Sequence, residues 1–130
     1  VSNGTIEPEL FQELLPLIDA INIDVKGFTE NIYKRLGGGF EQVKSNVKLA
    51  ARSTHLEITS LIVPRLNESL DDMRQEVMWL SGLSQNIPLH ITRYFPRYKM
   101  TDVEATKIEL LYELRDVASE YLSDVMIGNV

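Results

Sequence analysis

Four short runs rich in β-branched or aromatic residues alternate with longer segments of helical period, and this alternation constrains the fold most strongly. The runs span about 20–26, 56–63, 89–94 and 124–130. Strands separated by helical segments are typical of repeated β–α units, which build a mostly parallel sheet. The sequence therefore predicts an α/β fold with about four parallel strands and outer helices. Because a full eight-stranded barrel takes about 250 residues, this chain of 130 residues is predicted to form a partial (β/α) barrel.

The segments between these runs have recognisable helix ends. Pro8 is suited to the first turn of a helix that Pro16 ends. Short polar side chains that cap a first turn predict where the later helices begin. The expected caps are Thr29, Ser69 with Asp72, and Thr101 with Glu104, the last pair having the spacing of a capping box. The predicted order is a helix followed by βαβαβαβ, in a single domain that covers residues 1–130.

The acidic balance of the chain argues against nucleic acid as a partner. The chain has 19 acidic and 13 basic residues, a formal net charge of -6, whereas phosphate backbones attract basic surfaces. No apolar run approaches the roughly 20 residues that cross a bilayer, and no basic segment followed by an apolar one opens the sequence. We therefore expect a cytoplasmic protein that binds neither nucleic acid nor membrane.

The chain contains no cysteine. Disulfides, thiolate nucleophiles, zinc ribbons and protein-ligated iron–sulfur clusters are therefore excluded within these residues. The two histidines, His55 and His90, lie too far apart in sequence for a local pair of metal ligands. We predict no metal ligands in this chain, and any cluster chemistry must come from elsewhere.

Polar residues near the carboxyl ends of the expected strands are the candidates for a site, because chemistry in such sheets lies beyond those ends. Asp24 and Lys26 lie two apart on one strand face and can offer opposite charges to a zwitterionic ligand. Spacing alone leaves open a structural ion pair between them and a Schiff-base role for Lys26. A lone histidine such as His90 is more often a hydrogen-bonded structural residue than a catalyst. The other candidates are Glu57, Thr59, Thr92 and Arg93.

Several segments together resemble one family, and they run in order along essentially the whole chain. They are Val1–Thr5 (VSNGT), Ile23–Gly27 (IDVKG), Glu57–Thr59 leading to Val63, Pro64 and Asn67, and His90–Met100 (HITRYFPRYKM). Their order and spacing resemble the radical S-adenosylmethionine proteins related to pyruvate formate-lyase activating enzyme, in particular the AmmeMemoRadiSam-system branch.

The resemblance implies a partial barrel in which a 4Fe–4S cluster reductively cleaves S-adenosylmethionine to a 5′-deoxyadenosyl radical. The C-x3-C-x2-C motif that binds the cluster belongs to the family's N-terminal half, so this chain corresponds to the C-terminal half and is expected to be inactive alone. Carried over by segment, Lys26 would meet the methionine carboxylate and Asp24 would help to orient it. Asn3 would lie at the neighbouring strand end, and His90 and Thr59 would lie toward the adenosine. No catalytic residue is assigned.

Three positions depart from the family's pattern. Val1 stands where the activating enzymes carry an aspartate, and Arg65 and Phe95 replace an expected glycine and histidine. The resemblance therefore implies the cofactor but not the substrate. Two alternatives from other classes stay open, a non-redox barrel enzyme with Lys26 as a Schiff-base lysine and a noncatalytic interaction module.

The expected partners follow from the idea of half a barrel. They are the missing N-terminal half and an unidentified substrate, for which a protein is one candidate. An incomplete barrel also leaves an unpaired strand edge, and such edges tend to find partners. Self-association through the strand at 20–26 is therefore expected.

Overall fold

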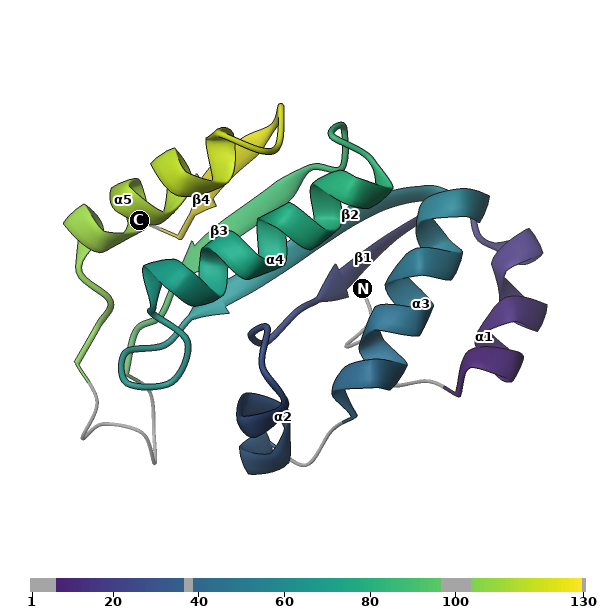
Figure 1. The fold of residues 1–130 in the computed structure, drawn as a ribbon, viewed down its shortest axis with the longest axis horizontal. Helices are drawn as coiled ribbons and strands as arrows, with labels where there is room; N and C mark the ends of the chain where they lie inside the picture. The colour runs from purple at the N-terminus through teal and green to yellow at the C-terminus, as the bar shows by residue number, and fades with distance from the viewer. Residues whose placement is uncertain (1–6, 37–38, 97–103, 130) are drawn as a thin grey trace.

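The computed structural model describes residues 7–36, 39–96 and 104–129 (Figure 1). Its strands are β1 (Ala20–Asp24), β2 (His55–Ile62), β3 (Leu89–Arg93) and β4 (Val125–Gly128). Its helices are α1 (Pro8–Leu14), the 3-10 helix η1 (Leu15–Leu17), α2 (Glu30–Leu36), α3 (Phe40–Ser53), α4 (Leu70–Leu83) and α5 (Ile108–Ser119). Parallel strands with flanking helices confirm the predicted α/β partial barrel. In the described part of the chain, no helix has the length and apolar character needed to cross a membrane.

The strands form one parallel sheet in the order β1-β2-β3-β4. Because this order advances in one direction, right-handed crossovers place every connecting helix on the same face. Figure 1 shows α3, α4 and α5 along that face. We call it the covered face. The opposite side is the open face, which carries Asn22, Asp24, His55, Glu57, Thr59, Leu61, His90 and Thr92.

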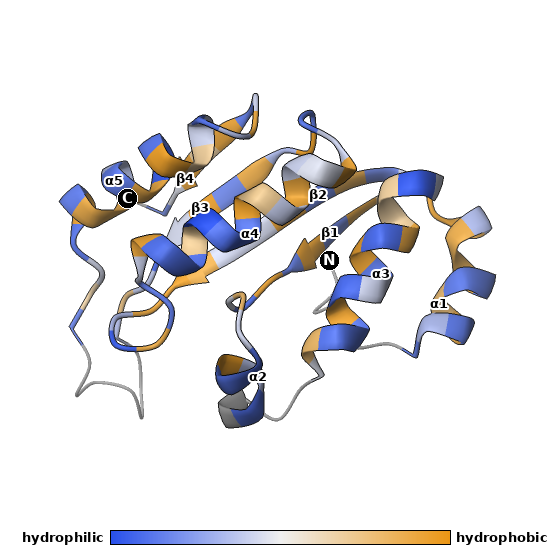
Figure 2. Cartoon of the chain, in the orientation of Figure 1, coloured by the Kyte–Doolittle hydropathy of each residue, from blue (hydrophilic) through white to orange (hydrophobic). Residues whose placement is uncertain are grey.

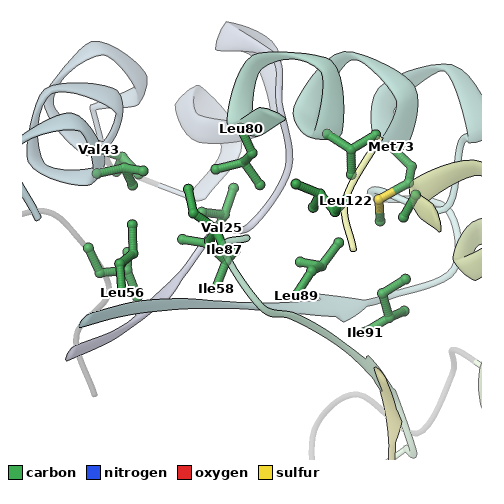
Figure 3. Packing of buried hydrophobic residues seen from close by; sticks show 14 of the residues in the cluster. Val25, Val43, Leu56, Ile58, Met73, Leu80, Ile87, Leu89, Ile91 and Leu122 are labelled. Atoms are coloured by element: carbon green, nitrogen blue, oxygen red, sulfur yellow. The ribbon is translucent and has the colours of Figure 1, made fainter. Parts of the chain in front are cut away.

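The hydrophobic core lies between the covered face and the helices. Alternate strand residues point toward the helices, and Figure 3 shows four of them, Leu56, Ile58, Leu89 and Ile91, none more than 4% exposed. Helices α3, α4 and α5 meet them with buried apolar side chains, and hydropathy alternates along these helices as expected for helices buried on one side (Figure 2). The buried helical residues include Val43, Val47, Met73, Val77, Leu80, Leu111 and Leu114.

Two of the three predicted helix caps are confirmed. The Ser69 hydroxyl accepts a hydrogen bond from the Asp72 amide at 3.3 Å, and the Thr29 hydroxyl accepts one from the Ile32 amide at 3.2 Å. The capping box at Glu104 is wrong, because α5 begins only at Ile108, and its partner Thr101 lies outside the described residues.

Tertiary hydrogen bonds explain this later start of α5. Thr106 is fully buried, and its hydroxyl donates to the Ile62 carbonyl at 2.5 Å while its amide donates to the Tyr94 carbonyl at 3.1 Å. These bonds tie the segment before α5 to the ends of β2 and β3. They outweigh the local capping preference at Glu104.

Strand β1 ends at Asp24, two residues earlier than predicted. The chain then turns, because the Lys26 amide donates to the Tyr33 hydroxyl at 3.0 Å and Gly27 has a φ of +147°. A Cβ atom at Gly27 would lie 2.5 Å from the Ile32 side chain, so only glycine fits this turn. Lys26 therefore lies in the loop after β1 and not on the strand.

Candidate functional site

A cavity of about 250 Å³ lies at the carboxyl ends of β1 and β2. Asp24, Lys26 and Thr59 line it together, so three of the five predicted cofactor residues share one hollow. The register of the sheet explains part of this grouping, because Asp24 lies directly opposite Thr59. The remaining lining residues are Val25, Leu61, Val63, Leu66, Asn67 and Tyr94.

The two charged residues of this cavity are not bonded to each other. Asp24 is half-buried and Lys26 is exposed, and in the described residues neither takes part in an ion pair. The structural ion pair that the sequence left open is therefore not formed, because Lys26 lies beyond the strand end and strand alternation no longer applies to it. Both charges are available to a ligand.

Thr59 is held in place by its neighbour on β1. Its hydroxyl donates to the side-chain oxygen of Asn22 at 2.8 Å, across the two strands of the open face. An alcohol oxygen keeps acceptor capacity when its hydrogen is donated in this way. Thr59 therefore presents an oriented acceptor in the lining of the cavity.

Asn67, for which the sequence predicts no role, braces the cavity wall. It is only 5% exposed. Its amide nitrogen donates to the carbonyls of Lys26 at 3.0 Å and Leu61 at 2.8 Å, and its oxygen accepts from the Val63 amide at 2.7 Å. One side chain thus ties the loop after β1 to the end of β2. An asparagine soon after a predicted strand and a proline is the only sequence signal for this role.

His90 does not line the cavity, although it lies directly opposite Thr59 in the sheet. Its Nε2 atom contacts the Glu57 carboxylate at 2.5 Å, and His55 Nε2 contacts the other oxygen of that carboxylate at 3.0 Å. The bonds from His90 and then His55 lower the pKa of Glu57 below its ordinary value. Asn3, the fifth predicted residue, lies outside the described residues.

Sequence spacing could not have found this cluster of His55, Glu57 and His90. His55 and Glu57 share a face by two-residue alternation, but only the register of β2 against β3 brings His90 to them. In the part of the chain that the structure describes, no group of three or more histidine, aspartate or glutamate residues is arranged to hold a metal ion.

A second glutamate, Glu76 of α4, lies beneath the covered face. It is 2% exposed and accepts a hydrogen bond from the Ser60 hydroxyl at 2.9 Å. Burial raises the pKa of Glu76 to about 8, against the smaller lowering effect of Ser60. Burial also raises the pKa of Asp72, one turn earlier in α4.

Two other hollows, of about 430 and 470 Å³, are larger than the cavity but lie away from the open face. The first is lined by α2 and the start of α4, with the acidic residues Asp71 and Asp72. The second mixes Arg65 and Lys107 with Glu68 and Glu104, so it offers no net charge to a ligand. Neither of these hollows is lined by a strand residue, whereas Asp24 of β1 and Thr59 of β2 line the smaller cavity. Because ligands of parallel α/β sheets bind at the carboxyl ends of the strands, the smaller cavity is the candidate.

Sheet, helices and cavity together define the class of fold, a partial barrel of parallel β–α units with a hollow at the carboxyl ends of its strands. No protein-family model matches the sequence. The uncharacterized protein MJ0808 of Methanocaldococcus jannaschii is 39% identical over 133 residues, which cover 100% of this chain and 39% of that protein. The chain thus spans about two fifths of the length of this relative.

A solved structure makes the fold more specific. A domain of pyruvate-formate lyase-activating enzyme from Bacteroides vulgatus is similar with a TM-score of 0.85, over 99% of this chain and 80% of that chain. The two sequences are 14% identical, so this likeness establishes a shared fold. The chain has the fold of an activating-enzyme domain, as the resemblance implied.

Proposed function

We propose that this chain is the C-terminal half of the catalytic barrel of a radical S-adenosylmethionine enzyme and forms one wall of the cofactor site. One observation carries the proposal. Asp24, Lys26 and Thr59 line a single cavity at the carboxyl ends of the strands, in a fold shared with an activating-enzyme domain.

The side chains around the cavity suit the amino-acid end of S-adenosylmethionine. The exposed ammonium of Lys26 would bind the methionine carboxylate, and the carboxylate of Asp24 would orient the zwitterion. Thr59 and, from the next strand, His90 would lie toward the adenosine. Bound beside a reduced 4Fe–4S cluster, the cofactor supplies a 5′-deoxyadenosyl radical.

The chain fits only part of this cofactor assembly. A cavity of about 250 Å³ lies below the roughly 300–1,000 Å³ that is usual for complete ligand sites. The sequence has no cysteine to hold a cluster. We therefore propose that a preceding N-terminal half supplies the cluster ligands and the opposite wall, and the greater length of MJ0808 accommodates such a half.

The edge of the sheet suggests where that half joins. Among the described strands, β1 pairs with β2 alone, so its outer edge has backbone groups available for another strand. The N-terminal half would pair there, and in its absence a second copy of the chain would do so. Light scattering of the isolated chain should then detect an oligomer, and a monomer at high concentration would contradict this pairing.

The Schiff-base alternative has less support. A nucleophilic lysine needs a desolvated pocket or a cationic neighbour to release its proton, whereas Lys26 is exposed. Borohydride trapping with a carbonyl substrate should leave Lys26 without a covalent adduct. A mass increase at Lys26 would favour the non-redox enzyme instead.

Reconstitution with iron, sulfide, a reductant and S-adenosylmethionine tests the proposal itself. The isolated chain should form no 5′-deoxyadenosine, because it has no thiolate to hold a cluster. The longer protein, with a C-x3-C-x2-C motif before Val1, should form it. Turnover by the isolated chain, or the absence of that motif from the encoded residues before Val1, would refute the proposal and leave the noncatalytic module.

A further inference from the structure

Glu57 bridges two histidines on the open face and uses both oxygens of its carboxylate to do so. Oε1 meets His90 Nε2 at 2.5 Å, and Oε2 meets His55 Nε2 at 3.0 Å. The His90 side chain is 30% exposed, whereas that of His55 is 59% exposed. Because charge-assisted hydrogen bonds strengthen as water is excluded, the bond to His90 should dominate the orientation of the carboxylate.

This contact fixes which nitrogen of His90 carries a hydrogen. An ionised carboxylate only accepts hydrogen bonds, so Nε2 must be the donor. In a neutral imidazole the other nitrogen, Nδ1, is then an acceptor. In the described part of the chain, no hydrogen bond engages Nδ1 of His90.

The position of His90 gives that acceptor a use. His90 does not itself line the cavity, but it lies directly opposite Thr59, which does. The ring nitrogen that a histidine presents to a ligand decides which ligand groups it can bind, because a protonated nitrogen donates a hydrogen bond and an unprotonated one accepts it. An acceptor nitrogen fits a hydroxyl or amino group and rejects another acceptor.

We infer that Glu57 is a positioning residue for the ligand site, which holds His90 with Nε2 as donor and leaves Nδ1 to accept from a hydroxyl or amino group of the ligand. The inference rests on the proposed function, because it takes the cavity as a cofactor site. A rival account is that the Glu57–His90 bond only ties β2 to β3. That account predicts no effect on ligand affinity beyond the effect on folding.

The first test reads the tautomer directly and needs no cofactor. Long-range 1H–15N spectra of the 15N-labelled chain, at a pH where an ordinary imidazole is neutral, distinguish protonated from unprotonated ring nitrogens. His90 should show one tautomer, with the hydrogen on Nε2. Glu57→Ala should give a mixture, and His55→Ala, which removes the other imidazole on the same carboxylate, should not. A single unchanged tautomer in Glu57→Ala would overturn the inference.

The second test is a double-mutant cycle on S-adenosylmethionine affinity in the longer protein. Glu57→Ala should weaken binding about 3- to 10-fold, as expected for one misoriented hydrogen bond. In a His90→Ala background it should have no further effect, because the two residues act as a unit. An affinity unchanged in Glu57→Ala but weakened in His90→Ala would contradict the positioning role. If the longer protein does not bind the cofactor, the proposed function fails. The spectra still show by themselves whether Glu57 fixes the tautomer of His90.

Discussion

Glu76 and Glu57 lie on opposite sides of the same sheet, and the two sides change their pKa in opposite directions. Glu76, between α4 and the covered face, is buried and has its pKa raised to about 8. Glu57, on the open face, is hydrogen-bonded to His90 and His55, and its pKa is lowered. On the covered face desolvation decides the protonation state, and on the open face hydrogen bonding decides it.

This difference between the two faces of the sheet suggests that one face stabilises the fold and the other is available for binding. The covered face holds the apolar core against the helices, so its residues have neighbours on every side. The open face has half-exposed polar side chains that bond to one another across strands, as Thr59 does with Asn22. Groups that are oriented but still accessible are those a ligand can use. We therefore place the fold's stability on the covered face and the proposed ligand site on the open one.

Substitutions that remove one hydrophobic side chain from each face should give the largest contrast. Ile58 is fully buried on the covered face, and Leu61 is 45% exposed on the open face. Ile58→Ala should lower the free energy of unfolding by about 2–5 kcal/mol because it leaves a cavity. Leu61→Ala should lower it by less than about 1 kcal/mol. Urea denaturation measures both, and equal losses would show that the open face is also packed.

The pH dependence of stability should reveal the buried carboxyl group of Glu76. Burial raises its pKa from 4.5 to about 8, so between these values the unfolded chain releases a proton that the folded chain keeps. Stability therefore falls as pH rises through this window, by on the order of 5 kcal/mol at about 1.4 kcal/mol per pKa unit, and levels off above it. Glu76→Gln should remove this fall.

Glu57→Gln is the matched control, because the sign of its effect is opposite. The pKa of Glu57 is lowered in the folded chain, so its contribution is present above the unfolded pKa and is lost as pH falls through the folded one. Stability curves of the two variants should therefore separate from the unmodified chain at opposite ends of the pH range. Parallel curves would mean that the two faces do not differ in this way.

Asn67 should be the most sensitive polar residue near the cavity. Its side chain makes three hydrogen bonds to the backbone while only 5% exposed. Asn67→Ala leaves those backbone groups without partners and should cost about 2 kcal/mol. Asn86→Ala is the control, because Asn86 is exposed. Equal melting temperatures for the two variants would contradict the bracing role.

Arg65 should give the smallest effect, in the stabilising direction. It has a φ of 69°, in the left-handed region that favours glycine, and the family resemblance also led us to expect glycine there. Arg65→Gly should raise the free energy of unfolding by about 1 kcal/mol, because it relieves this strain. A loss of stability would show that the Arg65 side chain contributes more than its backbone costs.

The sequence predicts the scaffold well because its signals are local. Runs of β-branched and aromatic residues placed the four strands, and Thr29 and Ser69 marked two helix starts correctly. The errors arose where distant contacts decide. Thr106 holds the chain extended before α5, and the turn at Gly27 removes Lys26 from β1.

Part of the candidate site was likewise beyond reach of the sequence. The segment around Asp24 and Lys26 was visible as a motif, and its placement in one cavity with Thr59 follows from parallel register. The contact of Glu57 with both histidines depends on the pairing of β2 with β3. That pairing joins residues far apart in the chain, and no spacing rule predicts it.

Cofactor affinity and melting temperature of Lys26→Ala, measured on the same preparation of the longer protein, test the central claim most directly. A charge-assisted hydrogen bond to a carboxylate is worth roughly 1.5–3 kcal/mol, so the dissociation constant for S-adenosylmethionine should rise about 10- to 150-fold. The melting temperature should stay the same, because Lys26 is exposed and forms no ion pair with Asp24. Lys48→Ala, at an exposed lysine of α3, should change neither quantity. Unchanged affinity in Lys26→Ala, or a lower melting temperature with normal binding, would contradict the placement of the ligand on the open face.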